Sequence, residues 1–291
     1  MTARKEARAG LLFASPWAIG FLVFLAYPLI ASMVYSFCDY SVLKPPVWIG
    51  LDNYKDLLHD ELFWTALKNT LLYAALALPA GLATSLILAM LLNAKVKGMP
   101  IYRTFFFIPS LVPQVSLAVL WLWVLNGEHG VLNPLLAHLG ITGPNWLSDP
   151  NWSKPSMVLM SVWGGGNAML IYLASLQDVP QQLVEAAELD GANGWQKTRN
   201  VTIPTISPVI LFNGVMGLIG TLQVFAVPYV MFPNGTPARS TYFYSMYLFD
   251  NAFKYQKMGY ASAMGWILFV LVLILTLVSL RLSERHVHYG D

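Results

Sequence analysis

Six long apolar stretches constrain the fold of this chain more than any other feature. A helix crosses the hydrocarbon core of a bilayer with roughly 20 mostly apolar residues. At that depth backbone polar groups must be satisfied within their own segment, and the stretches lack the two-residue alternation of membrane barrel strands. The sequence therefore predicts an all-α polytopic membrane protein with six transmembrane helices: Leu11 to Phe37, Asn69 to Leu92, Phe105 to Leu125, Ser156 to Leu176, Val209 to Phe232 and Tyr260 to Leu282.

The composition supports a membrane protein and excludes other classes. Hydrophobic residues make up 56% of the chain and charged residues 11%, with a mean hydropathy of +0.55. These values are far from those of an average soluble protein. The net charge of +2 and the scattered basic residues give no reason to expect a nucleic-acid partner. The first stretch follows Arg4, Lys5 and Arg8 but exceeds the roughly 7 to 15 residues of a signal-peptide core, so we expect an uncleaved anchor.

Lysine and arginine residues between the stretches predict the orientation. Short cytoplasmic loops of membrane proteins are enriched in both. If the N-terminus lies inside, the inner segments carry Arg4, Lys5, Arg8, Lys95, Lys97, Arg103, Lys197, Arg199, Arg281 and Arg285, and the other basic residues are spread over longer outer loops. We therefore expect both termini and the polar segment 178–208 in the cytoplasm.

The same pattern divides the chain into parts. From the N-terminus, the predicted parts are a cytoplasmic tail (1–10), the first transmembrane helix (11–37), an outer loop (38–68), a five-helix core (69–282) and a second cytoplasmic tail (283–291). In the outer loop, Val47 to Trp64 alternates polar and apolar residues as a short helix at the membrane interface does. Bends are expected at the prolines and glycines inside the apolar stretches, because proline frees a backbone carbonyl: Pro28, Pro79, Pro109, Pro113, Pro228 and Gly164 to Gly166.

The polar segment 178–208 predicts a helix, a turn and a second helix. Pro180 suits the first turn of a helix over Gln181 to Leu189. Gly191 can adopt the left-handed conformation that closes it, and Asn193 with Gln196 can form a capping box. The acidic residues of this segment have no nucleophile, histidine or metal-ligand spacing beside them, and the tail residues His286 and His288 are expected to be solvated. We therefore expect neither a catalytic nor a metal site.

The same segment resembles the EAA loop of binding-protein-dependent ABC importer permeases. Glu185-Ala-Ala, Asp190-Gly-Ala, Ile203-Pro204 and Pro208 match that motif, whereas Thr198 stands where the family usually has Phe. The resemblance implies the type I ABC importer permease (MetI-like) fold. It also implies that the loop docks as a coupling helix on a cytoplasmic ATPase dimer, which would use ATP and Mg while this chain binds no cofactor. The coupling residues would be Glu185, Ala186, Ala187, Asp190, Gly191 and Ala192. An ordinary amphipathic connector is the alternative, but the match extends over both helices, the turn and the prolines.

Further motifs are similar to those of maltose-type carbohydrate importers. They are Gly50 to Tyr54, Asn69-Thr70, Arg103 to Pro109, Gly130 to Asn133 and Gly259 to Ala263. This resemblance implies a second permease subunit and an extracytoplasmic sugar-binding protein as partners, besides membrane lipid. The location would be the cytoplasmic (inner) membrane of a bacterium or archaeon.

The apolar stretches contain no Asp, Glu, Lys, Arg or His away from their ends. Ionisable residues at bilayer depth mark ion and proton paths, so their absence argues against an ion-coupled carrier and against selection of a charged substrate by a buried counter-ion. Neutral polar side chains are present, and the resemblance implies that the fourth and fifth helices line the translocation pathway. The candidates are Ser161, Gly165, Ala168, Asn213, Thr221 and Gln223. For each of them, hydrogen bonding between packed helices is the alternative role.

Two other functions remain open from the sequence alone. One is an ATP-independent secondary carrier for a neutral polar solute. The other is a membrane-embedded enzyme, which the lack of any acid, base or metal set in the stretches disfavours. The nucleotide-binding pattern GxxxxGK[ST] is absent, so any ATP hydrolysis requires another subunit.

Overall fold

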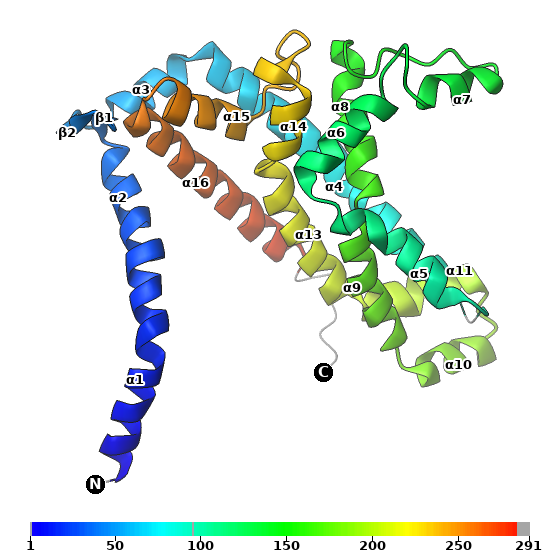
Figure 1. The fold of residues 1–291 in the computed structure, drawn as a ribbon. Coiled ribbons are helices and arrows are strands. Elements are labelled where there is room, and N and C mark those ends of the chain that lie inside the picture. The colour runs from blue at the N-terminus through cyan, green and yellow to red at the C-terminus, as the bar shows by residue number, and fades with distance from the viewer. Residues whose placement is uncertain (1, 95, 284–291) are drawn as a thin grey trace. The chain divides into compact units, whose positions relative to one another are not determined.

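A computed structural model describes residues 2–94 and 96–283. The chain forms two compact units, one of residues 1–61 with 248–270 and the other of residues 62–247 with 271–291. In the described part, the regular structure is helical apart from one antiparallel hairpin of β1 (Cys38–Ser41) and β2 (Lys44–Trp48) (Figure 1). Lys95, Arg285, His286 and His288, and the predicted tail beyond Ser283, lie outside the described residues.

The predicted apolar stretches all lie in long helices or bent helix pairs. Within the described residues, four helices are long and apolar enough to cross a membrane, or up to six if each bent pair counts as one span. The four are Gly10–Tyr35, Glu61–Leu92, Ser207–Met231 and Met258–Ser283, and the pairs are Met99–Leu111 with Gln114–Val124 and Pro150–Trp163 with Gly166–Gln177. The prediction of a multi-pass helical protein is confirmed, but the third stretch is not a single straight helix.

The first unit begins with a long helix that contains one wide turn. It consists of α1 (Thr2–Phe21), the π-helical turn η1 (Leu22–Ala26) and α2 (Tyr27–Tyr35). The N–H of Tyr27 bonds to Leu22 O, five residues back, just before Pro28, which has no N–H to donate. A bend is expected at Pro28, and the structure has a π-helical turn just before this proline. The helix ends two residues before the predicted Phe37 because the chain turns there into β1.

The predicted outer loop contains one short helix within the segment where the sequence predicts one. Val47 and Trp48 belong to β2, the short helix α3 is confined to Asp52–His59, and α4 already begins at Glu61. The amide of Asn53 holds the turn between α2 and β1, since its Nδ2 donates to the carbonyl oxygens of Ser36 (3.0 Å) and Cys38 (2.9 Å). The short helix predicted within Val47 to Trp64 is thus α3, and its position at the membrane interface stays a prediction.

The last elements of the first unit are η5 (Asp250–Lys254) and the first half of α16 (Met258–Ser283). Gly259 lets α16 approach the C-terminal end of α2, because a Cβ there would overlap the carbonyl oxygen of Cys38. The hydroxyl of Tyr260 donates to Asp60 Oδ2 at 2.6 Å, and Trp266 Nε1 donates to Ser32 Oγ at 3.3 Å. The start of α16 is thus joined to both α2 and the segment after α3.

The second unit holds the broken helices. Its elements are α4 (Glu61–Leu92), α5 (Met99–Phe107), η2 (Ile108–Leu111), α6 (Gln114–Val124), α7 (Leu132–His138), α8 (Pro150–Trp163), α9 (Gly166–Gln177), α10 (Gln181–Leu189), α11 (Gly194–Lys197), η3 (Thr198–Thr202), α12 (Ile203–Thr205), α13 (Ser207–Leu222), α14 (Ala226–Met231), η4 (Pro233–Gly235) and α15 (Tyr244–Phe249), which ends in the first unit.

The bends follow the expected residues only in part. The axis turns by 100° between Leu111 and Gln114, at Pro113, and by 45° at Gly164 to Gly165. By contrast, Pro79 lies inside the continuous helix α4. Near Pro228 the break falls earlier, after Leu222, and the proline itself lies within α14. Proline therefore marks these bends only where the surrounding packing also interrupts the helix.

A buried cluster joins α4 to α9 near the predicted cytoplasmic end. It contains Ala89, Leu92, Met169, Tyr172, Leu173, Leu176 and Ile206. Arg103 closes the end of α4, since its Nε and Nη2 donate to Leu92 O at 3.2 and 3.0 Å. Ile206 lies between α12 and α13, so the segment that follows α11 is fixed to the same core as α9.

Candidate coupling loop and solute cavity

The segment after α9 forms two short helices joined by a tight turn (Figure 1). At the end of α10, the N–H of Ala192 bonds to Ala187 O (2.9 Å) and that of Gly191 to Glu188 O (3.0 Å). Gly191 has φ +79°, the left-handed conformation that this type of helix end requires. The predicted end of the first helix is confirmed, whereas Pro180 precedes the helix rather than lying in its first turn.

The second helix begins with the predicted capping box. The N–H of Gln196 donates to Asn193 Oδ1 at 2.9 Å, and the N–H of Asn193 donates to Gln196 Oε1 at 2.8 Å. The two helices are also joined by an ion pair between Lys197 Nζ and Glu188 Oε1 at 2.5 Å. Local caps thus hold this pair of helices, since neither α10 nor α11 has a buried residue.

The loop exposes apolar side chains that its own chain does not cover. Leu189 is 90% exposed, Trp195 70% and Leu183 49%. The motif residue Glu185 accepts a hydrogen bond from Gln181 Nε2 at 2.9 Å and has no ion-pair partner among the described residues. Exposed large apolar groups beside charged ones are typical of a surface that binds another protein.

A cavity of about 490 Å³ lies where the helix breaks of the second unit meet. The break between α5 and α6 contributes Ser110 and Gln114, the break between α8 and α9 contributes Asn167, and the break between α13 and α14 contributes Gln223 and Phe225. Irregular backbone at membrane depth is tolerated where it lines a cavity. None of the lining residues is charged.

A second cavity of about 450 Å³ adjoins the first, because Ser161 and Asn167 line both. It is bordered by α4, α9 and α13 and is lined by most of the predicted pathway residues: Ser161, Gly165, Ala168, Asn213 and Thr221. Gln223, the remaining one, lines the first cavity. The structure thus brings the six predicted residues to two adjoining cavities.

Several of these polar side chains bond to their own helix. Asn213 Nδ2 donates to Val209 O at 3.1 Å, Thr221 Oγ1 to Gly217 O at 2.9 Å and Ser161 Oγ to Val158 O at 2.8 Å. Their oxygens can still accept hydrogen bonds from a bound solute. The donors most suitable for a solute are therefore the side-chain amides of Asn167, Gln114 and Gln223 at the breaks.

Gly165 has a packing role. A Cβ at this position would lie 2.6 Å from Ser85 Oγ, which itself donates to Gly165 O at 3.1 Å. A Cβ at Gly166 would lie 3.1 Å from Phe106 O and from Ser110 Oγ. The glycines therefore let the break between α8 and α9 contact both α4 and the break after α5.

Most lining residues of the two cavities are absent from the sequence-based candidates, among them Asn167, Tyr73 and Gln114. Tyr73 lies on α4, which contributes no other described residue to the lining of the first cavity, and nothing in its sequence context distinguishes it from a packed tyrosine. Gln114 is the only side-chain amide in the third apolar stretch and follows Pro113 directly, so its sequence does contain a signal. In the described part of the chain, no group of three or more His, Cys, Asp or Glu residues could hold a metal ion.

Comparison with known proteins identifies the family. Residues 79–289 match the family described as binding-protein-dependent transport system inner membrane component, and the chain belongs to this family of ABC importer permeases. It is 41% identical to the probable ABC transporter permease protein YesP of Bacillus subtilis over 98% of this chain and 94% of YesP. It is 34% identical to the arabinooligosaccharides transport system permease protein AraP of the same organism, over 96% and 90% of the two chains.

The structure also resembles a solved transporter. It matches a chain of the bacterial alginate ABC transporter, solved in complex with an alginate pentasaccharide-bound periplasmic protein, with a TM-score of 0.85 and 28% identity. The match covers 97% of this chain and 96% of that one. The expected type I importer (MetI-like) fold is confirmed, and the chain is a membrane transport subunit rather than an enzyme. Family membership also decides against the secondary carrier and the membrane-embedded enzyme.

Proposed function

We propose that this chain is one of two permease subunits of an ATP-driven carbohydrate importer and that its cavity at the helix breaks forms part of the sugar pathway. The observation that carries the proposal is the meeting of three helix breaks at one cavity with a neutral polar lining. The relatives agree in substrate class, since AraP is named for arabinooligosaccharides and the alginate transporter carries a polysaccharide.

The lining suits a neutral sugar. Side-chain amides such as Gln114, Asn167 and Gln223 both donate and accept hydrogen bonds, as sugar hydroxyl groups require. The rings of Tyr73 and Phe225 offer apolar faces to the C–H faces of a sugar. A cavity of about 490 Å³ is within the usual range of small-molecule sites.

The loop of α10 and α11 is proposed to bind the cytoplasmic ATPase dimer, which would hold ATP and Mg. Its exposed Leu189 and Trp195, its charged Glu185 and its match to the EAA motif support this role. The resemblance implies two further partners, a second permease and an extracytoplasmic sugar-binding protein. It also implies a location in the inner membrane with both termini inside the cell. The chain is proposed to be divided as the sequence predicts, into two tails, a first transmembrane helix, an outer loop and a five-helix core, with the coupling loop at 178–208 in that core.

The core beneath the loop explains how movement of the ATPase could reach the cavity. Tyr172 on α9 and Ile206 before α13 belong to one buried cluster, so α9 and α13 are fixed together at the base of the loop. Asn167, at the start of α9, and Gln223, just after α13, both line the cavity. A displacement of α10 would therefore move both walls, and ATP need only bias two conformations by a few kcal/mol.

Uptake by the reconstituted complex tests the pathway. Replacement of both Asn167 and Gln223 by Leu removes two hydrogen-bonding amides at nearly unchanged size. We expect sugar uptake in proteoliposomes to fall by about tenfold or more, because each lost hydrogen bond to the solute costs about 1 kcal/mol. ATPase binding should be unchanged. Ser279→Ala is the control, because Ser279 lies on α16 and lines neither cavity. Wild-type uptake in the double variant would refute the proposed pathway.

A further inference from the structure

Three basic residues lie at the predicted outer end of the second unit. Lys68 is on α4, Lys154 is on α8, and Arg239 is in the loop between η4 and α15. The ammonium groups of Lys68 and Lys154 are close enough to repel each other, and Lys154 is half-buried. None of the three side chains forms an ion pair among the described residues.

Side-chain hydrogen bonds join the loop of Arg239 to both helices. Asn69, the residue after the lysine of α4, donates from Nδ2 to Arg239 O at 2.8 Å. Ser153, the residue before the lysine of α8, shares a hydrogen bond of 2.8 Å with the hydroxyl group of Ser240. Because the direct neighbours of the three basic residues contact one another, the basic residues form one cluster.

The backbone of this loop is held in an uncommon conformation. Asn234, Ala238 and Arg239 have φ +55°, +49° and +57°, which costs a residue with a Cβ about 1–2 kcal/mol. Thr241 Oγ1 donates to Thr236 O at 2.6 Å across the loop. Such strain persists only where the surrounding contacts maintain it. The loop therefore presents the exposed side chain of Arg239 from a fixed backbone.

Lys154 lies on the face of α8 that borders the first cavity. Met157 and Ser161 line this cavity and follow Lys154 by three and seven residues, which places all of them near one helix face. At 1.5 Å per residue, Lys154 is about 4–5 Å further along the axis than Met157, toward the predicted outside. The cluster therefore lies beyond the outer end of the cavity wall.

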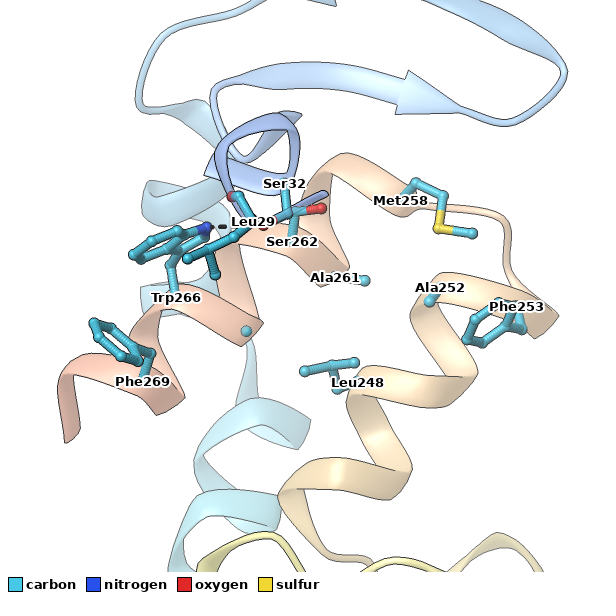
Figure 2. A pocket seen from close by; sticks show the side chains of 11 residues that line it. Leu29, Ser32, Leu248, Ala252, Phe253, Met258, Ala261, Ser262, Trp266 and Phe269 are labelled. Atoms are coloured by element: carbon cyan, nitrogen blue, oxygen red, sulfur yellow. Dashed lines mark hydrogen bonds between the residues drawn. The ribbon is translucent and has the colours of Figure 1, made fainter. Parts of the chain in front are cut away.

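A solute in the cavities does not supply the missing negative charge. Neither cavity of the second unit has a charged lining residue, and the groove between α2, η5 and α16 in the first unit (Figure 2) has none either. The neutral sugar proposed for the first cavity carries no charge to the cluster. An opposite charge stabilises cations that are held together. An anionic group that approaches from outside fits this cluster.

We propose that Lys68, Lys154 and Arg239 bind an acidic patch on the extracytoplasmic sugar-binding protein, beside the outer end of the cavity. The inference rests on the proposed function, in which such a protein delivers the sugar from outside. Asp and Glu carboxylates are the anions of a protein surface, and a guanidinium group binds a carboxylate through two parallel hydrogen bonds. Opposite charges across an interface mainly accelerate association, so the cluster should set the rate of docking.

Docking on the assembled transporter tests the proposal. The probe is the secreted sugar-binding protein of the same organism that restores uptake to the reconstituted complex. The triple variant Lys68→Gln, Lys154→Gln, Arg239→Gln, in nanodiscs of phosphatidylcholine alone, should lower the association rate constant on the order of tenfold at low salt. At high salt the rate constants of variant and wild type should converge, because salt screens exposed charges.

A second triple variant is the matched control. Lys44→Gln, Lys55→Gln and Lys257→Gln remove the same net charge from other predicted outer positions and should leave the association rate constant within about twofold of the wild type. Equal rate constants for the cluster variant and the wild type, or an equal loss in the control, would overturn the proposal. A loss that appears only when the nanodiscs contain phosphatidylglycerol would overturn it too, because the cluster would then bind lipid phosphate.

Uptake in proteoliposomes separates this inference from the proposed function. With the cluster variant, half-maximal uptake should require roughly tenfold more binding protein, while the maximal rate stays that of the wild type. A lower maximal rate with unchanged docking would assign the cluster to the sugar path and overturn the inference alone. Wild-type uptake that needs no binding protein would contradict the proposed function together with the inference.

Discussion

At the scale of single residues, two glycines of the second unit are required for different physical reasons. Gly191 adopts φ +79°, a conformation that costs other residues about 1–2 kcal/mol. Gly165 has an ordinary backbone conformation but lies against Ser85, where a Cβ would be 2.6 Å from the hydroxyl oxygen. The first glycine shapes the turn between α10 and α11, and the second shapes the cavity wall.

Gly191→Ala should weaken ATPase binding without affecting membrane insertion. Alanine in the left-handed conformation is strained by about 1–2 kcal/mol, which favours opening of the turn after α10. If binding requires the closed turn, the same free energy corresponds to roughly a five- to thirtyfold loss in affinity for the ATPase. Gly194→Ala is the matched control, because no atom lies within 4 Å of a Cβ there. Co-purification of the ATPase with each variant measures the effect, and equal recovery would contradict the assigned role of the turn.

Gly165→Ala should destabilise the second unit. The Ser85 hydroxyl would have to rotate away from Gly165 O and would stay buried without that bond, at a cost of roughly 1–3 kcal/mol. Gly164→Ala is the control, since its nearest neighbours would lie at 3.7 and 3.8 Å. Thermal unfolding of the detergent-solubilised complex measures the change. Adding Ser85→Gly should restore part of the loss, and a wild-type midpoint for Gly165→Ala alone would refute the close contact.

At the scale of elements, the loop of α10 and α11 is stabilised locally while its apolar side chains stay exposed. A capping box, a glycine helix end and the Glu188–Lys197 pair define its shape without any buried residue. An element of this kind retains its shape while it moves as a body. This combination suits a part that transmits displacement from a bound partner.

Glu185→Lys should separate ATP hydrolysis from uptake. The carboxylate is exposed and has no ion-pair partner among the described residues, so its reversal leaves folding and insertion intact but repels a basic group on the ATPase. Glu6→Lys makes the same change at an exposed position of α1. Proteoliposomes measure sugar taken up per ATP hydrolysed. A wild-type ratio in Glu185→Lys would count against the proposed docking.

At the scale of the whole molecule, residues far apart in the sequence share one cavity. Tyr73 on α4 and Phe225 after α13 both line it, and three separate helix breaks meet there. The first unit has a different character, because its helices α2 and α16 join at a few contacts such as that of Trp266 with Ser32.

The local signals in the sequence determined much of this protein. Apolar length predicted the spanning segments, and Gly191, Asn193 and Gln196 predicted the end of α10 and the start of α11, because caps and spans depend on neighbours within a few residues. The EAA motif lies in the same local segment and predicted the family.

Only the tertiary structure decided which irregularities become breaks and where they meet. Pro79 leaves α4 continuous, whereas Pro109 and Pro113 accompany a 100° bend, since a freed carbonyl can be satisfied within a helix or at a break according to its surroundings. The same holds for Tyr73 and Gln114, whose place at the cavity depends on how distant helices pack. Helix packing depends on contacts between different segments, and the periodicity of residues along one segment carries no information about those contacts.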